Sequence, residues 1–109
     1  MAIATKVLGQ SAPGATTETD LYTVPALTSA VCSSISICNR GTAATTFRIS
    51  VAVGGGVTAN EDYIYYDVAV PGNDTFIATI GITLTAADVL RVYAGNANLS
   101  FSLFGQEIS

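Results

Sequence analysis

Hydrophobic and polar residues alternate along most of this chain with the period of two that is typical of β-strands. The clearest run is 45–53, where Phe47, Ile49 and Val51 alternate with polar or small residues. No stretch of useful length shows the period of an amphipathic helix. We therefore predict an all-β protein of about eight strands in a single domain over residues 1–109. The expected strands are 2–10, 17–24, 30–39, 45–53, 62–70, 75–82, 89–94 and 98–104.

Turn residues separate these ranges and suggest how they connect. The strongest signal is Pro71–Asp74, because Pro presets φ while Gly and Asn tolerate positive φ. We expect this turn to join the fifth and sixth strands in a hairpin. Residues 85–88 fit one helical turn or a tight corner. Short strands with turns every ~8–12 residues predict an antiparallel β-sandwich or jelly roll.

The alternation also predicts which side chains are buried. In the third strand we expect Val31, Ile35 and Ile37 on one face, and Cys32 and Cys38 on the other. The two cysteines would then lie ~20 Å apart, too far for a disulfide, so we expect free, buried thiols and a reducing compartment. The predicted core comprises Ile35, Ile37, Phe47, Ile49, Val51, Ile80, Val92, Leu99, Phe101 and Leu103.

The composition combines high hydrophobicity with few charges. Half of the 109 residues are hydrophobic and 11% are charged, against ~25% in typical domains. We infer that other subunits cover part of the surface, the alternative being a monomer with a surface of Thr, Ser, Asn and Gly. With net charge -4 and four scattered basic residues, we expect no nucleic-acid partner and no membrane partner. The first ten residues do not resemble a signal peptide.

Candidate chemistry is sparse. The sequence has no histidine, which removes Ser-His and Cys-His nucleophile pairs and most zinc sites. The triplet Gly54–Gly56 is not followed by the Lys-Ser/Thr of a phosphate-binding loop. We expect Glu61, Asp62 and Asp67 to be solvated side chains. We therefore predict a protein that is not an enzyme and that has no catalytic residues, metal or cofactor.

Two segments are candidates for contact with a partner. Tyr63 and Tyr65 are expected to share one strand face, opposite Tyr66, and an outward tyrosine face would suit a protein or sugar partner. The alternative is ordinary strand-forming aromatics. The first strand is a candidate docking edge, because chain ends move most freely. The candidate interface residues are Ile3, Lys6, Leu8, Tyr63 and Tyr65.

Several short segments, spread over nearly the whole chain and without a catalytic motif, carry a resemblance to known proteins. The segments are Lys6–Gln10, Leu21–Ala26, Ile37–Gly41, Tyr66–Val68, Val70–Thr75, Gly81–Leu84, Asp88–Ala94 and Asn98–Gly105. Together they resemble a family of small β-sandwich virion structural proteins of tailed bacteriophages.

The resemblance implies a virion component, assembled in the host cytoplasm. Our first hypothesis is a capsid decoration (cement) protein, a homodimer or homotrimer that binds the major capsid protein. The second is a tail, neck or fibre-base component that binds other virion proteins. The third, from a different class, is a carbohydrate-binding β-sandwich that uses the tyrosines near Tyr63.

Overall fold

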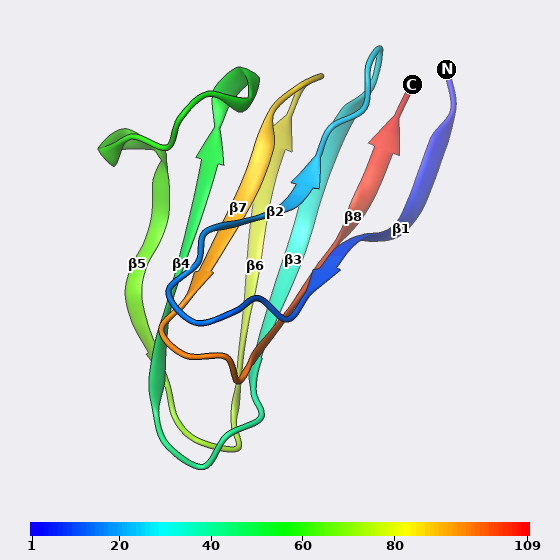
Figure 1. Cartoon of the computed structure of the whole chain (residues 1–109). Coiled ribbons are helices and arrows are strands. Elements are labelled where there is room, and N and C mark those ends of the chain that lie inside the picture. Colours follow the sequence, from blue (N-terminus) through cyan, green and yellow to red (C-terminus); the bar gives the residue numbers. More distant parts are fainter.

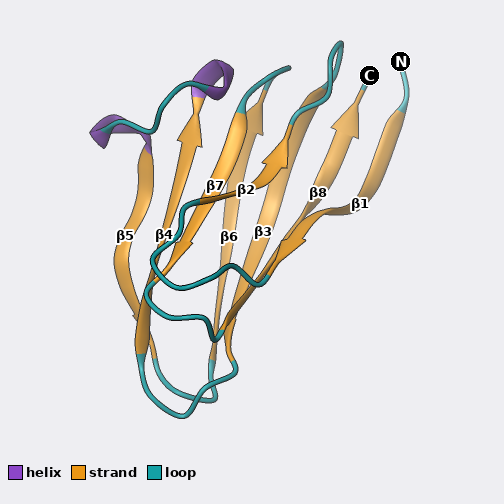
Figure 2. Ribbon diagram, in the orientation of Figure 1, coloured by secondary structure: helices purple, strands orange, loops and turns teal.

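Two four-stranded antiparallel sheets lie face to face in the computed structural model, which describes residues 1–109 (Figure 1). Short loops connect the strands at both ends of the sandwich, and two 3-10 turns follow β4 (Figure 2). Neither turn is a helix long and apolar enough to cross a membrane. The elements are β1 (Ile3–Ser11), β2 (Thr19–Thr23), β3 (Ser29–Asn39), β4 (Thr45–Ala52), η1 (Val53–Gly55), η2 (Asn60–Asp62), β5 (Tyr63–Val70), β6 (Thr75–Leu84), β7 (Val89–Ala94) and β8 (Leu99–Ile108).

The strand order is that of a jelly roll. One sheet has the order β1-β8-β3-β6 and the other β2-β7-β4-β5. Only β4 and β5 are neighbours both in sequence and in a sheet, and every other connection crosses between the layers. Two interlocked Greek keys give this arrangement. The predicted antiparallel β-sandwich is therefore confirmed.

The predicted hairpin between the fifth and sixth strands is wrong. β5 and β6 belong to different sheets, so the turn at 71–74 is a crossover. The backbone of Gly72 packs against the carbonyl of Thr42, in a space that a Cβ would fill, and the Asn73 amide donates to the Gly41 carbonyl at 2.8 Å. The 40–44 loop is itself a crossover, so the two connections support each other at this end of the sandwich.

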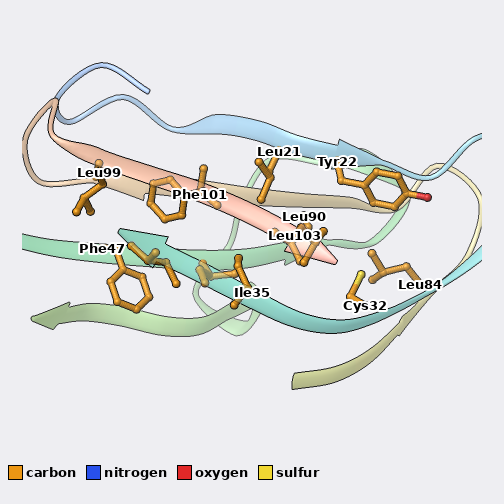
Figure 3. Close-up of a cluster of buried hydrophobic side chains, with 14 of the residues drawn as sticks. Leu21, Tyr22, Cys32, Ile35, Phe47, Leu84, Leu90, Leu99, Phe101 and Leu103 are labelled. Carbon is orange, nitrogen blue, oxygen red and sulfur yellow. The ribbon is translucent and has the colours of Figure 1, made fainter. Parts of the chain in front are cut away.

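Side chains from the inner faces of both sheets form one core (Figure 3). Phe47 occupies its centre, with ring centroids 5.3 Å from Phe76, 5.9 Å from Tyr65 and 6.4 Å from Phe101. Of the predicted core residues, Val51 and Ile80 are only partly buried. The other eight are buried: Ile35, Ile37, Phe47, Ile49, Val92, Leu99, Phe101 and Leu103.

A bulge in β3 overturns the predicted faces of that strand. Against β8 the register shifts between Cys32 and Ser34, so Ser33 is an extra residue there. Against β6 the register also shifts at this point, where Ile80 and Gly81 lie opposite Ser33. Cys32 therefore points into the core together with Ile35, while Val31 points outward. Both cysteines are free, as predicted, but only Cys32 is buried and Cys38 is half-exposed on the outer face. Burial raises the pKa of the Cys32 thiol to about 11, so this thiol stays protonated at neutral pH.

Candidate interaction surfaces

The outer face of the β1-β8-β3-β6 sheet contains no charged side chain. We call it the uncharged face and define it by the residues that alternate outward in the four paired strands. Its apolar members include Ile3, Val7 and Ile77, which are 57%, 48% and 69% exposed. The full set is Ile3, Thr5, Val7 and Gln10 of β1; Ser100, Ser102, Phe104, Gln106 and Ile108 of β8; Ser29, Val31, Ser34, Ser36 and Cys38 of β3; and Thr75, Ile77, Thr79 and Thr83 of β6.

The uncharged face is shallow. Its two hollows lie along β8, and their linings hold no ionisable group. Gln10 bridges one hollow by donating to the Ser102 hydroxyl at 3.3 Å. A surface of hydroxyl, amide and aliphatic groups suits another uncharged protein surface, because no charge has to be desolvated when the two meet.

The opposite outer face carries a cluster centred on Arg48. The guanidinium lies between two tyrosine rings, 4.2 Å from the centroid of Tyr66 and 4.4 Å from that of Tyr93. Its Nε and Nη2 atoms donate to both carboxylate oxygens of Asp67 at 2.7 and 3.4 Å. This bidentate contact raises the pKa of Arg48 further above its usual value. The charge of Arg48 is therefore neutralised within the chain, and its guanidinium is stacked between two tyrosine rings.

A second arginine on this face holds a loop in place. Arg91 donates to Asp20 at 2.8 Å, to the carbonyls of Gly55 and Gly56 at 3.2 and 2.6 Å, and to the Thr58 hydroxyl at 2.9 Å. These bonds tie the 54–58 segment to β7 and β2. Arg91 thus has a structural role, and its charge is also neutralised internally.

The tyrosines of β5 lie differently from the prediction. Two register shifts against β4 place Tyr63 opposite the outward Ser50, and Tyr65 opposite the inward Ile49. Tyr65 packs against the core, while Tyr63 meets Tyr66 edge to face at 4.9 Å. The predicted shared face of Tyr63 and Tyr65 is therefore wrong. Tyr63 joins the Arg48 cluster, which sequence alternation missed because it does not reveal bulges.

The candidate residues of β1 have three different environments. Ile3 is exposed on the uncharged face, whereas Leu8 occupies a bulge and packs against the core. The ammonium of Lys6 lies 2.8 Å from Glu107, whose other carboxylate oxygen accepts a 2.6 Å hydrogen bond from the Tyr22 hydroxyl. That these residues contact a partner stays a prediction.

The Lys6–Glu107–Tyr22 cluster joins the two sheets between their inner faces. Hydrogen bonds from Lys6 and then from Tyr22 lower the pKa of Glu107. Burial, with the hydrogen bond to Glu107, raises the pKa of Tyr22 well above its usual value. The cluster thus consists of the Lys6–Glu107 ion pair and the neutral Tyr22 hydroxyl, which donates to Glu107.

Two of the remaining carboxylates, Asp88 and Asp62, accept hydrogen bonds from nearby backbone amides. Asp88 accepts from the amides of Gly54 and Thr85 at 2.8 and 2.9 Å, which closes the corner at 85–88. Asp62 accepts from the Ala59 amide at 2.9 Å. No three His, Cys, Asp or Glu side chains converge as a metal site would require.

The four edge strands differ in how they are protected against pairing with another chain. β1 carries Lys6 and the bulge at Leu8, and β2 is five residues long and carries Asp20. β5 carries Asp67, whose φ of 53° marks an irregularity. β6 is ten residues long and has no charged residue, and a bulge at Gly81 leaves residues 75–79 regular. Natural edge strands are commonly protected by charge, shortness or bulges, so 75–79 is the least protected edge.

No protein-family model and no curated protein matches this chain.

Proposed function

We propose that this protein is a non-enzymatic structural component of a phage particle, and specifically a capsid decoration protein that binds the major capsid protein. The uncharged face is the contact surface in this proposal. The protein acts by adding a rigid domain to the shell, which strengthens contacts between capsid subunits.

The observation that supports the proposal is that one whole sheet face has no charged side chain. All the outward positions of four paired strands are uncharged, although the chain has twelve charged residues, four basic and eight acidic. The strands of this face are about 9–11 residues long, so at ~3.3 Å per residue and ~4.8 Å between strands the face measures roughly 500–600 Å². Covering it on both partners buries an area near the lower end of specific interfaces, ~1,200 Å².

The jelly roll and the sequence resemblance are consistent with this proposal. Jelly rolls occur in viral capsid proteins, but also in lectins and other classes, so the fold alone does not decide function. The resemblance to small virion proteins of tailed phages favours the particle over the other classes.

The decisive experiment compares particles with and without this protein. We expect cryo-electron microscopy to place it on the head in many symmetric copies, and heat or chelation to open the heads that lack it earlier. Ser102→Glu should abolish binding to bare heads, because it puts a charge in the middle of the uncharged face. Thr23→Glu, on the opposite outer face, is the matched control and should bind normally.

Two results would overturn the decoration proposal, and a third would overturn the proposed contact surface. Density confined to the tail or neck would make the protein a tail, neck or fibre-base component. Equal robustness of heads with and without the protein would remove the stabilising role. Normal head binding by Ser102→Glu would show that another surface makes the contact.

A second candidate function is carbohydrate binding at the Arg48 cluster. Tyr66 is 56% exposed beside the fixed Arg48–Asp67 pair, and an exposed ring next to charged donors and acceptors can stack on a sugar. Tyr66→Ala should then abolish binding on a glycan array, while Tyr65→Phe should retain it. An array on which the wild type binds nothing excludes this candidate.

A further inference from the structure

We propose that two copies of this chain pair through β6, antiparallel and about a two-fold axis that passes through Ile77. The starting observation is the unprotected edge at residues 75–79. β6 has β3 as its only neighbour in the sheet, so its other side presents unpaired backbone donors and acceptors. Ile77 in the middle of this segment is 69% exposed. This contact joins two copies of the chain and is separate from the proposed contact with the capsid.

The sequence of this edge is complementary to itself in that register. With Ile77 opposite Ile77 of the second copy, Thr75 faces Thr79 of that copy, and Phe76 faces its Ala78. Thr–Thr and β-branched pairs are favourable across antiparallel strands. The large Phe76 meets the small Ala78 on the inner side, where Phe76 already packs against Tyr65 at 5.6 Å.

Charge does not oppose this pairing. The nearest ionised group in sequence is Asp74, directly before the strand. In the proposed register the two Asp74 residues lie six residues apart along the pair, which is ~20 Å. This exceeds the Debye length of ~8 Å at physiological ionic strength, so their repulsion is largely screened.

The size of the contact determines its strength. Five paired residues per chain give a contact only ~17 Å long, which is smaller than the standard interface of ~800 Å² per partner. We therefore expect a weak dimer in free solution that is reinforced when neighbouring copies are held on a common surface. A two-fold axis normal to the sheet places both uncharged faces on the same side, so the dimer presents one continuous eight-stranded face.

Sedimentation equilibrium over protein concentrations up to about 1 mM tests the contact directly. We expect the average mass of the wild type to rise from that of the 11.1 kDa chain towards twice that value. Ile77→Lys should weaken the dimer roughly 10-fold, since two lysines would face each other directly in place of two isoleucines. Thr83→Lys introduces the same charge on the same strand, beyond the Gly81 bulge, and should dimerise normally.

Cysteine crosslinking tests the register. In a Cys38→Ser background, Ile77→Cys should form a disulfide-linked dimer in air, because directly opposite residues have Cβ atoms ~4.5–5.5 Å apart, close to disulfide geometry. Thr83→Cys should not. A wild type that remains monomeric at 1 mM overturns the proposal, as does equal crosslinking at both positions.

The competing dimer, with two uncharged faces stacked, is distinguished by a third variant. Ser102→Glu should leave the β6 dimer intact. Loss of the dimer in both Ser102→Glu and Thr83→Lys, whose side chains lie on the uncharged face but outside the proposed β6 contact, would show stacking instead. These measurements use the isolated protein. Failure of the β6 contact is thus separate from failure to bind a capsid, which only the particle experiments test.

Discussion

The two outer faces of this sandwich differ in how their polar groups are satisfied. On the β2-β7-β4-β5 face, Arg48 and Arg91 each bind a carboxylate of the same chain, and Arg91 also holds a loop. On the β1-β8-β3-β6 face there are no charges to neutralise, and one side-chain hydrogen bond joins Gln10 to Ser102. The first face thus helps to stabilise the fold, whereas the second is available to a partner. Substitutions on the two faces should therefore differ in their effect on the free energy of unfolding.

We expect the largest loss of stability from a substitution on the inner side of β8, with the outer side of the same strand as the comparison. Phe101 is 1% exposed and points into the core, whereas Phe104 points outward. Phe101→Ala should cost about 3–5 kcal/mol, as for other buried phenylalanines. Phe104→Ala should cost less, about 1–2 kcal/mol, because part of its side chain remains exposed. Urea denaturation measures both, and similar losses would mean that the uncharged face has a structural role.

Arg48→Ala should show the next largest effect, about 1–2 kcal/mol. It removes one ion pair and two cation–π contacts, each worth roughly 0.5–1 kcal/mol. Arg48→Lys should lose part of this, because an ammonium cannot make the bidentate contact with Asp67. A loss below about 0.5 kcal/mol for Arg48→Ala would contradict the view that this face stabilises the fold.

Glu107 belongs to the charged cluster on the inner side of the β1-β8-β3-β6 sheet. Its pKa is lowered in the folded protein by Lys6 and Tyr22, so its contribution is present above the unfolded pKa of about 4.3 and is lost as pH falls through the folded pKa. Glu107→Gln should cost about 1 kcal/mol at pH 7 and flatten the loss of stability below about pH 4.3. Glu61→Gln is the control in pH-dependent urea denaturation. An unchanged acid profile in Glu107→Gln would contradict this role.

We expect the smallest change in stability for Ser102→Glu, the variant that should most strongly reduce binding to heads. Ser102→Glu places a charge on the uncharged face, and exposed substitutions without specific contacts usually change stability by less than about 0.5 kcal/mol. Thermal unfolding at low protein concentration measures this. A loss above about 1.5 kcal/mol would mean that Ser102 is needed for folding, and its binding defect could then not be assigned to a contact.

Alternation along the sequence predicts most of this fold but not the details of its faces. The strands and most of the core follow from period-two patterns, since inward positions such as Leu99, Phe101 and Leu103 must be apolar. The pattern fails where a bulge adds one residue. Ser33 reverses the side to which Cys32 points, and the irregular pairing of β5 separates Tyr63 from Tyr65. Bulges depend on pairing between distant strands, which local sequence does not encode.

The same limit applies to the connections and to the surfaces. Pro71–Asp74 contains good turn residues, but whether a turn returns to the same sheet depends on the packing of Gly72 against the distant Thr42. The uncharged face combines positions from four strands that are far apart in the sequence. Its Ser, Thr and Gln residues can be recognised as one surface only from the register of the paired strands.

The register of β1 with β8 also has a consequence for when the protein becomes competent to assemble. Gln10 and Ser102, which are hydrogen-bonded across the uncharged face, lie 92 residues apart in sequence. Pairing between such distant segments forms slowly, because the loop between them must close before any contact is gained. A nascent chain therefore carries β1 without its partner strand until β8 has been made, and the uncharged face is incomplete until then. For the proposed contacts, this order means that the contact surface forms only after β8 has paired with β1.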